Sequence, residues 1–413
     1  MNKILVLFAL AVMLLVMPAA ASAEPLVFWH SMTDAQSAVM DSQAKKYMEA
    51  NPSITVEIRR FATPGELYTA LMTTDAASLP DIAAIDSSWQ TDLRNASRLI
   101  PVDDSILRSV RIAIKMDTYA PLWKASVFED KLWTLPYFAY NYAVVYDSDA
   151  FKKAGIKTVP ANRAQLYSYA SKLKNAGFGG LYVPVDKSPR ETAFYFTYFF
   201  AQAQPSSYAL ISKGLDGEAA EKALFWLNDM IYDTKVGTSD VTKASIFVGT
   251  PEDLLKASET RPNMRVARWG GNNKEGGIVL TSLAIMNKTG ANAEKSWFYL
   301  YYLGTFAQLL ELTLASPVLP SNKQVTLCPD YFERLEKYPG LRNFLALLGK
   351  GYVKPEILDY EKYAREYGSS VLDALNNRKG VTQAVRDSMQ VVNGLVSPVE
   401  APPQPTGQNS NKY

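Results

Sequence analysis

Polar and aromatic side chains stand directly after three apolar, strand-like stretches near the start of the chain. Trp29 and His30 end the first stretch, Thr63 follows the second, and Asp86 and Ser87 follow the third. A carboxylate such as Asp86 can accept hydrogen bonds from two hydroxyl groups, and an aromatic face suits the apolar C–H face of a sugar ring. These residue types favour the recognition of a small, hydroxyl-rich molecule.

Most of these side chains also have an ordinary structural role open to them. Trp29 fits a core position at the end of a strand equally well, since most large aromatic rings lie in the core. His30 stands in a polar segment, where it could serve only as a local hydrogen-bond partner. Asp86 could instead cap the helix that is predicted to follow it, and capping could be the whole role of Thr63.

Further candidates lie later in the sequence. Arg190 precedes a strongly aromatic helix and could meet an anionic group or a hydroxyl, although a solvated surface arginine fits as well. Trp269 ends a predicted strand beside two glycines and could stack on a ring, and Tyr352 is another aromatic candidate. A phosphate would require several cationic or N–H donors. Because only Arg190 and Lys354 are plausible side chains for it, we expect a neutral mono- or oligosaccharide.

The composition argues against several classes of protein. His30 is the single histidine and Cys328 the single cysteine, so a histidine-rich zinc site cannot form and a Ser-His-Asp triad would depend on His30. We find no glycine-rich nucleotide motif, P-loop or EF-hand loop. The net charge of +2 gives no reason to expect a nucleic acid or a membrane surface as a partner. These features remove several classes of enzyme, and we expect a protein without metal or cofactor.

The order of the predicted elements indicates an α/β fold. Helices over residues 35–51 and 63–77 alternate with strands over 54–58 and 82–85. Such alternation implies parallel strands joined by helices, and ligands of these sheets bind beyond the carboxyl ends of the strands. A second α/β run begins after residues 136–142, where we place a boundary between lobes. The apolar strand 277–286 is predicted to return to the first lobe.

The two ends of the chain have compositions of their own. Residues 1–23 combine a basic start, an unbroken apolar run and an Ala-Ser-Ala end, which is typical of a secretory signal peptide. No cysteine lies near the cleavage site, so we expect a mature protein without a lipid anchor, free in a bacterial periplasm. Residues 401–413 are polar and proline-rich and are expected to be disordered.

Several short motifs, in a shared order, resemble the extracellular solute-binding proteins of bacterial ABC importers. The likeness is greatest to the carbohydrate group that includes the maltose- and glycerol-3-phosphate-binding proteins. The motifs are Phe28-Trp29-His30-Ser31-Met32, Leu79-Pro80-Asp81-Ile82, Trp133-Thr134-Leu135-Pro136-Tyr137, Val144-Val145-Tyr146-Asp147, Ser282-Leu283-Ala284-Ile285 and Leu319-Pro320-Ser321.

The resemblance implies two α/β lobes, each a mostly parallel sheet flanked by helices, joined by crossing hinge strands. Lobe I would comprise residues 24–136 and 279–325, and lobe II residues 137–278 and 326–400. The family commonly places ligand contacts in the crossover, which here carries Tyr137, Tyr140 and Asn141.

The function that the resemblance implies is binding followed by a hinge movement. The protein would bind a carbohydrate between its lobes and, as a monomer, deliver it to the membrane permease subunits of an ABC importer. Two alternatives stay open: a secreted carbohydrate-active enzyme, which would need a pair of carboxylates, and a ligand-binding protein that reports to a sensor.

Overall fold

The computed structural model describes residues 24–102, 108–201, 217–268, 277–291, 293–353 and 359–395. The predicted signal peptide, the predicted disordered tail and Trp269 lie outside these residues. The strands are β1 Leu26–His30, β2 Val56–Arg60, β3 Ile82–Asp86, β4 Leu99–Ile100, β5 Val127–Phe128, β6 Lys131–Leu132, β7 Thr134–Asn141, β8 Ala143–Asp147, β9 Leu181–Tyr182, β10 Gly237–Thr238, β11 Ile246–Gly249, β12 Met264–Ala267, β13 Gly277–Met286, β14 Leu319–Pro320 and β15 Tyr352–Val353.

Helices flank these strands along the whole described chain. They are α2 Asp34–Ala50, α3 Pro64–Thr73, α4 Gln90–Asn95, α5 Arg108–Asp117, α6 Ala120–Ala125, α7 Ser148–Lys153, α8 Arg163–Asn175, α9 Pro189–Ala201, α11 Gly217–Tyr232, α12 Pro251–Thr260, α13 Ala293–Leu303, α14 Phe306–Ala315, α15 Pro329–Lys337, α16 Gly340–Leu348, α17 Tyr360–Leu375 and α18 Val381–Leu395. Short 3-10 turns also occur, of which Ser87–Trp89 matters most below.

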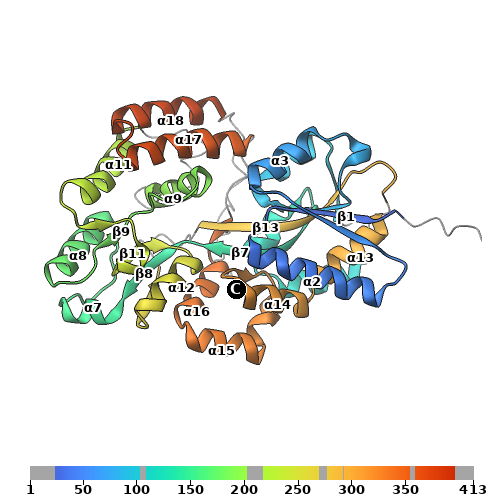
Figure 1. The fold of residues 1–413 in the computed structure, drawn as a ribbon, viewed down its shortest axis with the longest axis horizontal. Coiled ribbons are helices and arrows are strands. Elements are labelled where there is room, and N and C mark those ends of the chain that lie inside the picture. Colours follow the sequence, from blue (N-terminus) through green and yellow to red (C-terminus); the bar gives the residue numbers. More distant parts are fainter. Residues whose placement is uncertain are drawn as a thin grey trace, which may run out of the picture.

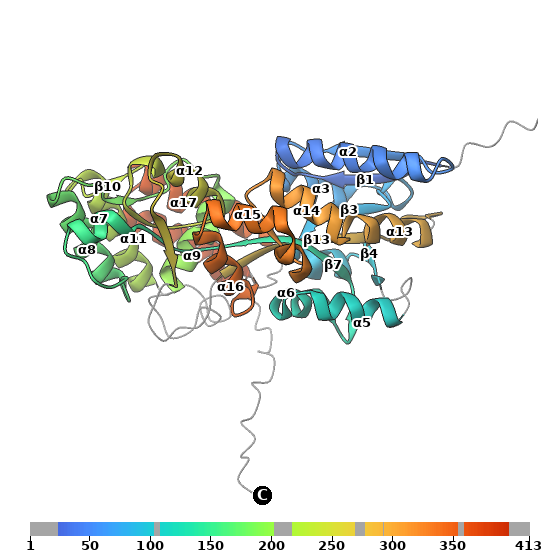
Figure 2. The same ribbon diagram turned by 90° about the horizontal axis from the view of Figure 1, so that it is seen from below.

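The strands form two main sheets, one in each half of the molecule. The first has the order β14-β7-β13-β3-β1-β2, with β4 and β15 also paired to β13, and the second has the order β10-β9-β11-β8-β12. Figure 1 shows β7 and β13 running between a half that carries β1, α2, α3 and α13 and a half that carries β8, β9, α8, α9, α11, α17 and α18. In Figure 2, α2 and α5 lie on opposite sides of the first sheet. The predicted α/β class with two lobes is confirmed.

The sheets are mixed, which corrects the expectation that each would be mostly parallel. In the first sheet β1 pairs in parallel with β2 and β3, but β13 is antiparallel to β3, β4 and β7. In the second, β9 is parallel to β10 and β11, but β8 is antiparallel to β11 and β12. Helical crossovers create the parallel pairs, whereas the strands near the crossing between the halves return in the opposite direction and pair antiparallel.

The chain passes from the first sheet to the second at Tyr142, the single residue between β7 and β8. Its backbone N–H donates to the carbonyl of Gly277, the first residue of β13, at 3.3 Å. The two predicted crossing strands therefore meet at this point. The predicted lobe limits at residues 136 and 279 fall inside β7 and β13, and they stay predictions.

Local sequence explains why the elements that reach this middle region begin where they do. All five residues of β3 are buried, as expected for a central strand covered on both faces. Thr63 accepts a hydrogen bond from the N–H of Glu66, and Pro64 occupies the first turn of α3, where its missing N–H removes no helical bond. At α12, Thr250 and Asp253 form a reciprocal capping box.

The apolar interior follows the two halves. One cluster packs around the first sheet and includes Phe28, Leu280 and Phe344, and a second packs α9, α11, α17 and α18 against β8, β9 and β11. A smaller cluster under α3 and α4 contains Trp29, Phe61 and Trp89. Within the described residues, no helix combines the length and apolar character that crossing a membrane requires.

Candidate ligand-binding site

A cavity of about 1460 Å³ lies between the first sheet and the helix starts of the second half. Its sheet side is formed by residues of β3, β7 and β13, including Asp86, Tyr140 and Thr281. Residues of α9, α12 and α17, including Arg190, Glu252 and Glu361, line the other side. Pockets for drug-sized molecules usually measure about 300–1,000 Å³, so this cavity has room for a larger ligand.

The end of β3 delivers Asp86 and Trp89 to the cavity. One carboxylate oxygen of Asp86 accepts hydrogen bonds from the backbone N–H of Ser88 at 2.9 Å and from its hydroxyl at 2.7 Å. Asp86 thus caps the Ser87–Trp89 turn, and its other carboxylate oxygen forms an ion pair with Arg190. The capping role and the cavity position, which were alternatives for the sequence, coexist in one side chain.

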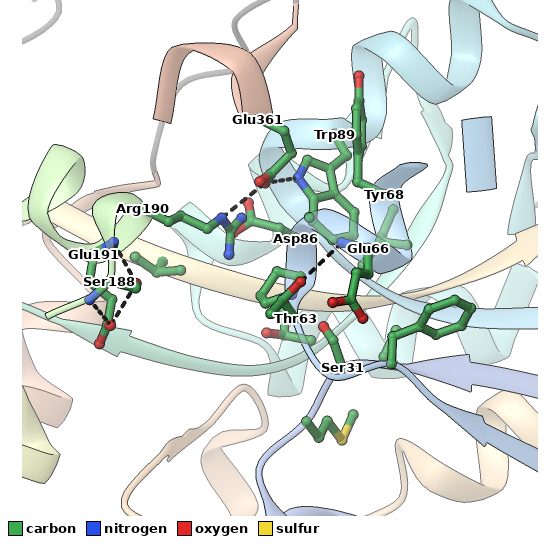
Figure 3. Close-up of a pocket in the computed structure, with 18 of the residues that line it drawn as sticks. Ser31, Thr63, Glu66, Tyr68, Asp86, Trp89, Ser188, Arg190, Glu191 and Glu361 are labelled. Carbon is green, nitrogen blue, oxygen red and sulfur yellow. Dashed lines mark hydrogen bonds and ion pairs between the residues drawn. The ribbon is translucent and has the colours of Figure 1, made fainter. Parts of the chain in front are cut away.

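Arg190 connects the two sides of the cavity. Its Nη2 lies 2.6 Å from Oδ2 of Asp86 on β3, and its Nε lies 2.9 Å from Oε1 of Glu361 on α17. The same Glu361 oxygen accepts a hydrogen bond from the indole N–H of Trp89 at 2.7 Å. Figure 3 shows the Arg190 side chain reaching toward Asp86 and Glu361, and the dashed line that joins Glu361 to the indole nitrogen of Trp89.

The environment of Arg190 fixes its charge. Burial by itself would lower the pKa of the guanidinium, but the carboxylates of Asp86 and Glu361 outweigh it and raise the pKa above its ordinary value. The guanidinium carbon also lies 5.4 Å from the ring centroid of Trp89 and 5.8 Å from that of Tyr360, within cation–π range. Arg190 is thus a permanently charged group held by two acids and two rings.

Aromatic side chains form much of the remaining lining. They are Phe61, Tyr68, Trp89, Phe138, Tyr140 and Phe194. The Tyr68 hydroxyl donates to Oδ2 of Asp92 at 2.8 Å. Burial, together with the nearby charge of Glu191, raises the pKa of Tyr140, and its uncharged hydroxyl is able to hydrogen bond. Aromatic faces together with fixed polar groups are what a hydroxyl-bearing ring requires.

The cavity brings together four of the residues that the sequence singled out. Thr63, Asp86, Tyr140 and Arg190 all line it. Thr63 also caps α3, with the N–H of Glu66 at 3.2 Å from its hydroxyl oxygen, a bond visible in Figure 3. That these four bind ligand stays a prediction, but they share one cavity although they come from separate elements.

Trp29 and His30 lie behind the cavity lining. Trp29 is buried and packs on Phe61 with ring centroids 5.2 Å apart. His30 was expected in a polar loop, and this is wrong: it is the last residue of β1 and is fully buried. Its Nδ1 accepts the backbone N–H of Met32 at 3.1 Å. Burial, with a smaller effect of the Arg60 charge, lowers the pKa of His30 to about 4.

Tyr137, Asn141 and Ser87 are buried away from the lining. The Tyr137 hydroxyl lies 3.4 Å from the sulfur of Met40, and the amide nitrogen of Asn141 donates to the carbonyl of Phe344 at 3.1 Å. Side chains alternate between the faces of a strand. The crossover therefore offers Phe138 and Tyr140 to the cavity and turns Tyr137 and Asn141 toward the opposite core.

The last two candidate side chains, those of Trp269 and Tyr352, fall on parts of the chain that the structure does not describe. Trp269 is outside the described residues. The backbone of Tyr352 pairs with Gly277 on β13, but its side chain belongs to the part of the chain that is not described. Their suggested roles in ligand binding stay predictions.

Sequence reasoning missed several residues that the structure places at the centre. Trp89 and Glu361 are not among the candidates that the sequence indicates. The available signal for Glu361 was an acidic residue in the first turn of an amphipathic helix, a common capping pattern that does not reveal what the helix faces. The described residues hold no cluster of three or more histidine, cysteine or acidic side chains suited to a metal ion.

Comparison with known proteins agrees with this architecture. A putative binding protein of Brucella abortus (strain 2308) is 26% identical over 371 residues, covering 83% of this chain and 86% of that protein. Maltose-bound MalE3 of T. maritima superposes with a TM-score of 0.71 at 16% identity, covering 90% of this chain and 99% of the other. UgpB of Mycobacterium tuberculosis, in complex with glycerophosphocholine, gives 0.69 at 14% identity, covering 91% and 98%.

The structural likeness, at such low identity, establishes the fold. The family comes from the sequence, because residues 29–245 match the family described as bacterial extracellular solute-binding protein. The matched segment runs from β1 to just before β11 and so includes Asp86, Trp89 and Arg190. The chain belongs to the bacterial extracellular solute-binding protein family.

Proposed function

We propose that this protein is the substrate-binding component of an ABC importer, which binds a carbohydrate between its two lobes in the periplasm and delivers it to the permease. The observation that carries the proposal is the large cavity, one side of which comes from strands of the first sheet and the other from helices of the second half. Family membership supports a binding role. The aromatic rings and carboxylates of the lining support a sugar as the ligand.

The contacts of Arg190 supply a physical route from binding to a change of shape. Asp86 and Trp89 belong to the first half, whereas Arg190 and Glu361 start helices of the second half. A ligand that hydrogen bonds to these groups interacts with both halves at once. Its binding therefore shifts the equilibrium from an open to a closed arrangement of the two halves. The size of the shift is set by the difference in binding free energy between the two arrangements.

The role needs no catalytic step, and we propose that the protein acts as a monomer without cofactor, metal or nucleic acid. Secretion through the signal peptide that residues 1–23 predict would bring the mature chain to the periplasm. A permease would then recognise the ligand-bound arrangement.

The test is a thermal-shift and calorimetric screen of the mature chain from Glu24 onward. The panel contains neutral oligosaccharides of two to four units, monosaccharides, amino acids and polyamines. A ligand that binds only the folded state raises the melting temperature, with about 2.7 kcal/mol of stabilisation at a hundred times Kd. The proposal predicts a shift with one sugar class and no change in that sugar after incubation. A shift with amino acids alone, or cleavage of the sugar, would overturn it.

A further inference from the structure

Five helices begin at the cavity, and this feature by itself suits an anionic ligand. The residues that cap or precede them and also line the cavity are Thr33 at α2, Thr63 at α3, Ser188 at α9, Thr250 at α12 and Asp359 at α17. Helix N-termini carry partial positive charge and free N–H groups, which makes them natural sites for phosphate. Whether this cavity accepts a phosphate depends on what already occupies those ends.

The chain's own side chains occupy them. The N–H of Glu66 donates to Thr63, and that of Glu191 donates to Ser188, whose hydroxyl and N–H both donate to the Glu191 carboxylate. Figure 3 shows both of these helix starts. Each end therefore has an acceptor in place and an acidic residue within its first turn, where a phosphate would otherwise bind.

The remaining helix starts follow the same pattern. At α12, Asp253 accepts from the N–H and hydroxyl of Thr250 at 3.0 and 2.9 Å. At α2, Thr33 and Gln36 cap each other. At α17, the side chain of the cap residue Asp359 makes no hydrogen bond to the helix start. Its backbone N–H instead donates to the two carboxylate oxygens of Asp92 at 3.2 and 3.1 Å, and the first turn carries the acidic Glu361.

The cations on the inner side of the cavity are also held by acids. Arg190 donates to Asp86 and Glu361. Lys187 lies 3.1 Å from Asp253 and 4.0 Å from Glu191. The other described cationic lining residues, Arg59, Lys362 and Arg365, are exposed.

What the lining offers a ligand is therefore mainly hydrogen-bond acceptors and aromatic faces. Carboxylate oxygens accept hydrogen bonds and cannot donate them, so they favour a ligand that brings hydroxyl donors. A phosphate ester carries negative charge and only acceptors at its phosphate, and it would lie beside Glu361 and Asp86 with no uncommitted inner cation to compensate. Like charges brought together in this way reject a ligand strongly.

We propose that this cavity selects an uncharged polyhydroxyl ligand and rejects phosphate esters, because the carboxylates of Asp86 and Glu361 neutralise Arg190 and the capping side chains fill the helix starts. The inference rests on the proposed function and narrows its substrate class. It also separates this chain from UgpB of Mycobacterium tuberculosis, whose solved complex holds glycerophosphocholine on a similar fold. The fold alone thus permits a phosphodiester as ligand, and the side chains that line the cavity determine which ligand is bound.

The experiment measures binding of glycerol 3-phosphate, inorganic phosphate and maltotriose to the mature chain by calorimetry at low salt. The wild-type protein is expected to bind each anion so weakly that only a lower limit for Kd is obtained, and the variants are compared with that limit. In Glu361→Gln, the amide keeps an oxygen that can accept from Trp89, and Asp86 remains as the single carboxylate paired with Arg190, so the cluster loses one of its two negative charges. This variant is expected to gain at least about 10-fold in affinity for glycerol 3-phosphate, as charge removal at a paired cation predicts.

Two further variants make the result specific. The double variant Arg190→Gln with Glu361→Gln keeps the amide but lacks the cation, so the gained affinity for glycerol 3-phosphate is expected to disappear. The matched control Glu336→Gln removes an exposed acid that pairs with Arg342 outside the lining, and it is expected to behave as the wild type. Circular dichroism melting confirms that each variant is folded before it is titrated.

The possible outcomes separate this inference from the proposed function. Tight binding of glycerol 3-phosphate by the wild type would overturn the inference while leaving a solute-binding role intact. The absence of any gain in folded Glu361→Gln would also overturn it. If the wild type binds neither the anions nor any neutral sugar of the wider panel, the proposed function itself fails and takes this inference with it.

Discussion

The two sides of the cavity are built on different principles. The sheet side consists of strand residues and rings, such as Ile85, Phe138, Tyr140 and Val279, whose positions follow from the pleat and register of β3, β7 and β13. The helix side consists of the first turns of α9, α12 and α17, where charged residues such as Arg190 and Glu361 gather. The difference suggests that the sheet side supplies shape and apolar contact, whereas the helix side supplies charge pairing and selectivity.

The largest expected effect is on the sheet side, at Trp89. Its side chain is almost fully buried, packs on Tyr68 with centroids 5.5 Å apart and donates to Glu361. Trp89→Ala is expected to cost about 3–4 kcal/mol of unfolding free energy, as for other buried tryptophans, and to abolish sugar binding. Urea unfolding and calorimetry measure both quantities.

Trp89→Phe provides the matched control. It keeps an aromatic face but removes the N–H donor, so about 1–2 kcal/mol of unfolding free energy should be lost and weak sugar binding should remain. Equal losses in the alanine and phenylalanine variants would show that the ring face contributes nothing, and that the sheet side has no separate role in shape.

The next effect is on the helix side, at Arg190. Arg190→Gln leaves Asp86 and Glu361 without their cation in a region where their side chains are 6% and 11% exposed. Removing one partner of a buried pair costs about 3–5 kcal/mol. Because the arginine side chain itself is 21% exposed, we expect about 2 kcal/mol, measured as unfolding free energy in urea.

Adding Asp86→Asn and Glu361→Gln to Arg190→Gln should recover most of that loss, because the amides no longer carry unpaired charge. A triple variant as unstable as Arg190→Gln alone would mean that the cluster stabilises by packing and not by charge. The proposed contrast between the two sides would then be incorrect.

We also expect the free energy of unfolding to depend on pH through His30, which lies in β1 of the first sheet. His30 has a pKa lowered to about 4 in the folded protein against about 6.5 when unfolded, so the unfolded chain takes up a proton first as pH falls. The stability contribution is full above about pH 6.5 and is lost progressively toward pH 4. Between pH 7.5 and 5 the unfolding free energy should fall by about 2 kcal/mol.

His30 is the single histidine of the chain, which makes this prediction easy to isolate. Unfolding free energies measured at several pH values in wild type and in His30→Gln should differ in slope between pH 7.5 and 5. If the variant retains the wild-type slope, the buried histidine is not its source, and another group must titrate in that range.

The smallest effect belongs to a charged residue of the helix side that has a solvated partner. Glu252 lies 2.8 Å from Lys256, and both side chains are about half exposed. Exposed pairs of this kind contribute less than about 0.5 kcal/mol, so Glu252→Gln should leave the melting temperature nearly unchanged. A destabilisation comparable to that of Arg190→Gln would remove the distinction between buried and exposed charges on this side.

The sequence predicted the sheet side better than the helix side. Strand ends can be located from apolar runs, and parallel strands bring their carboxyl ends to one edge of the sheet. The sequence alone therefore predicts that Thr63 and Asp86 lie near each other. The choice among Tyr137, Tyr140 and Asn141 needed the face of β7, which depends on its register with β13. The alternation of side chains along a strand places Tyr140 and Phe138 on the same face of β7. Which face of β7 lines the cavity is known only from the structure.

The helix side depends on contacts between distant segments. Glu361 is 171 residues from Arg190 and 272 from Trp89. No local pattern in the sequence predicts that these three side chains are in contact. His30 is a second example of a position that local sequence did not predict. Although its neighbours in the sequence are polar, its ring is buried beside that of Phe28 and near the charge of Arg60. Local patterns thus predict which elements form and where they end, whereas charge clusters between lobes follow from how the lobes are placed.

If both sides of the cavity hold one neutral sugar, substitutions on either side must weaken its binding. The most direct measurement is a calorimetric titration of the mature chain with neutral oligosaccharides at several temperatures, in wild type, Trp89→Ala and Arg190→Gln. We expect one site per chain with a negative heat-capacity change, as burial of apolar surface requires, and loss of binding in either variant. Tight sugar binding that survives both substitutions would contradict it, because the ligand would then lie elsewhere.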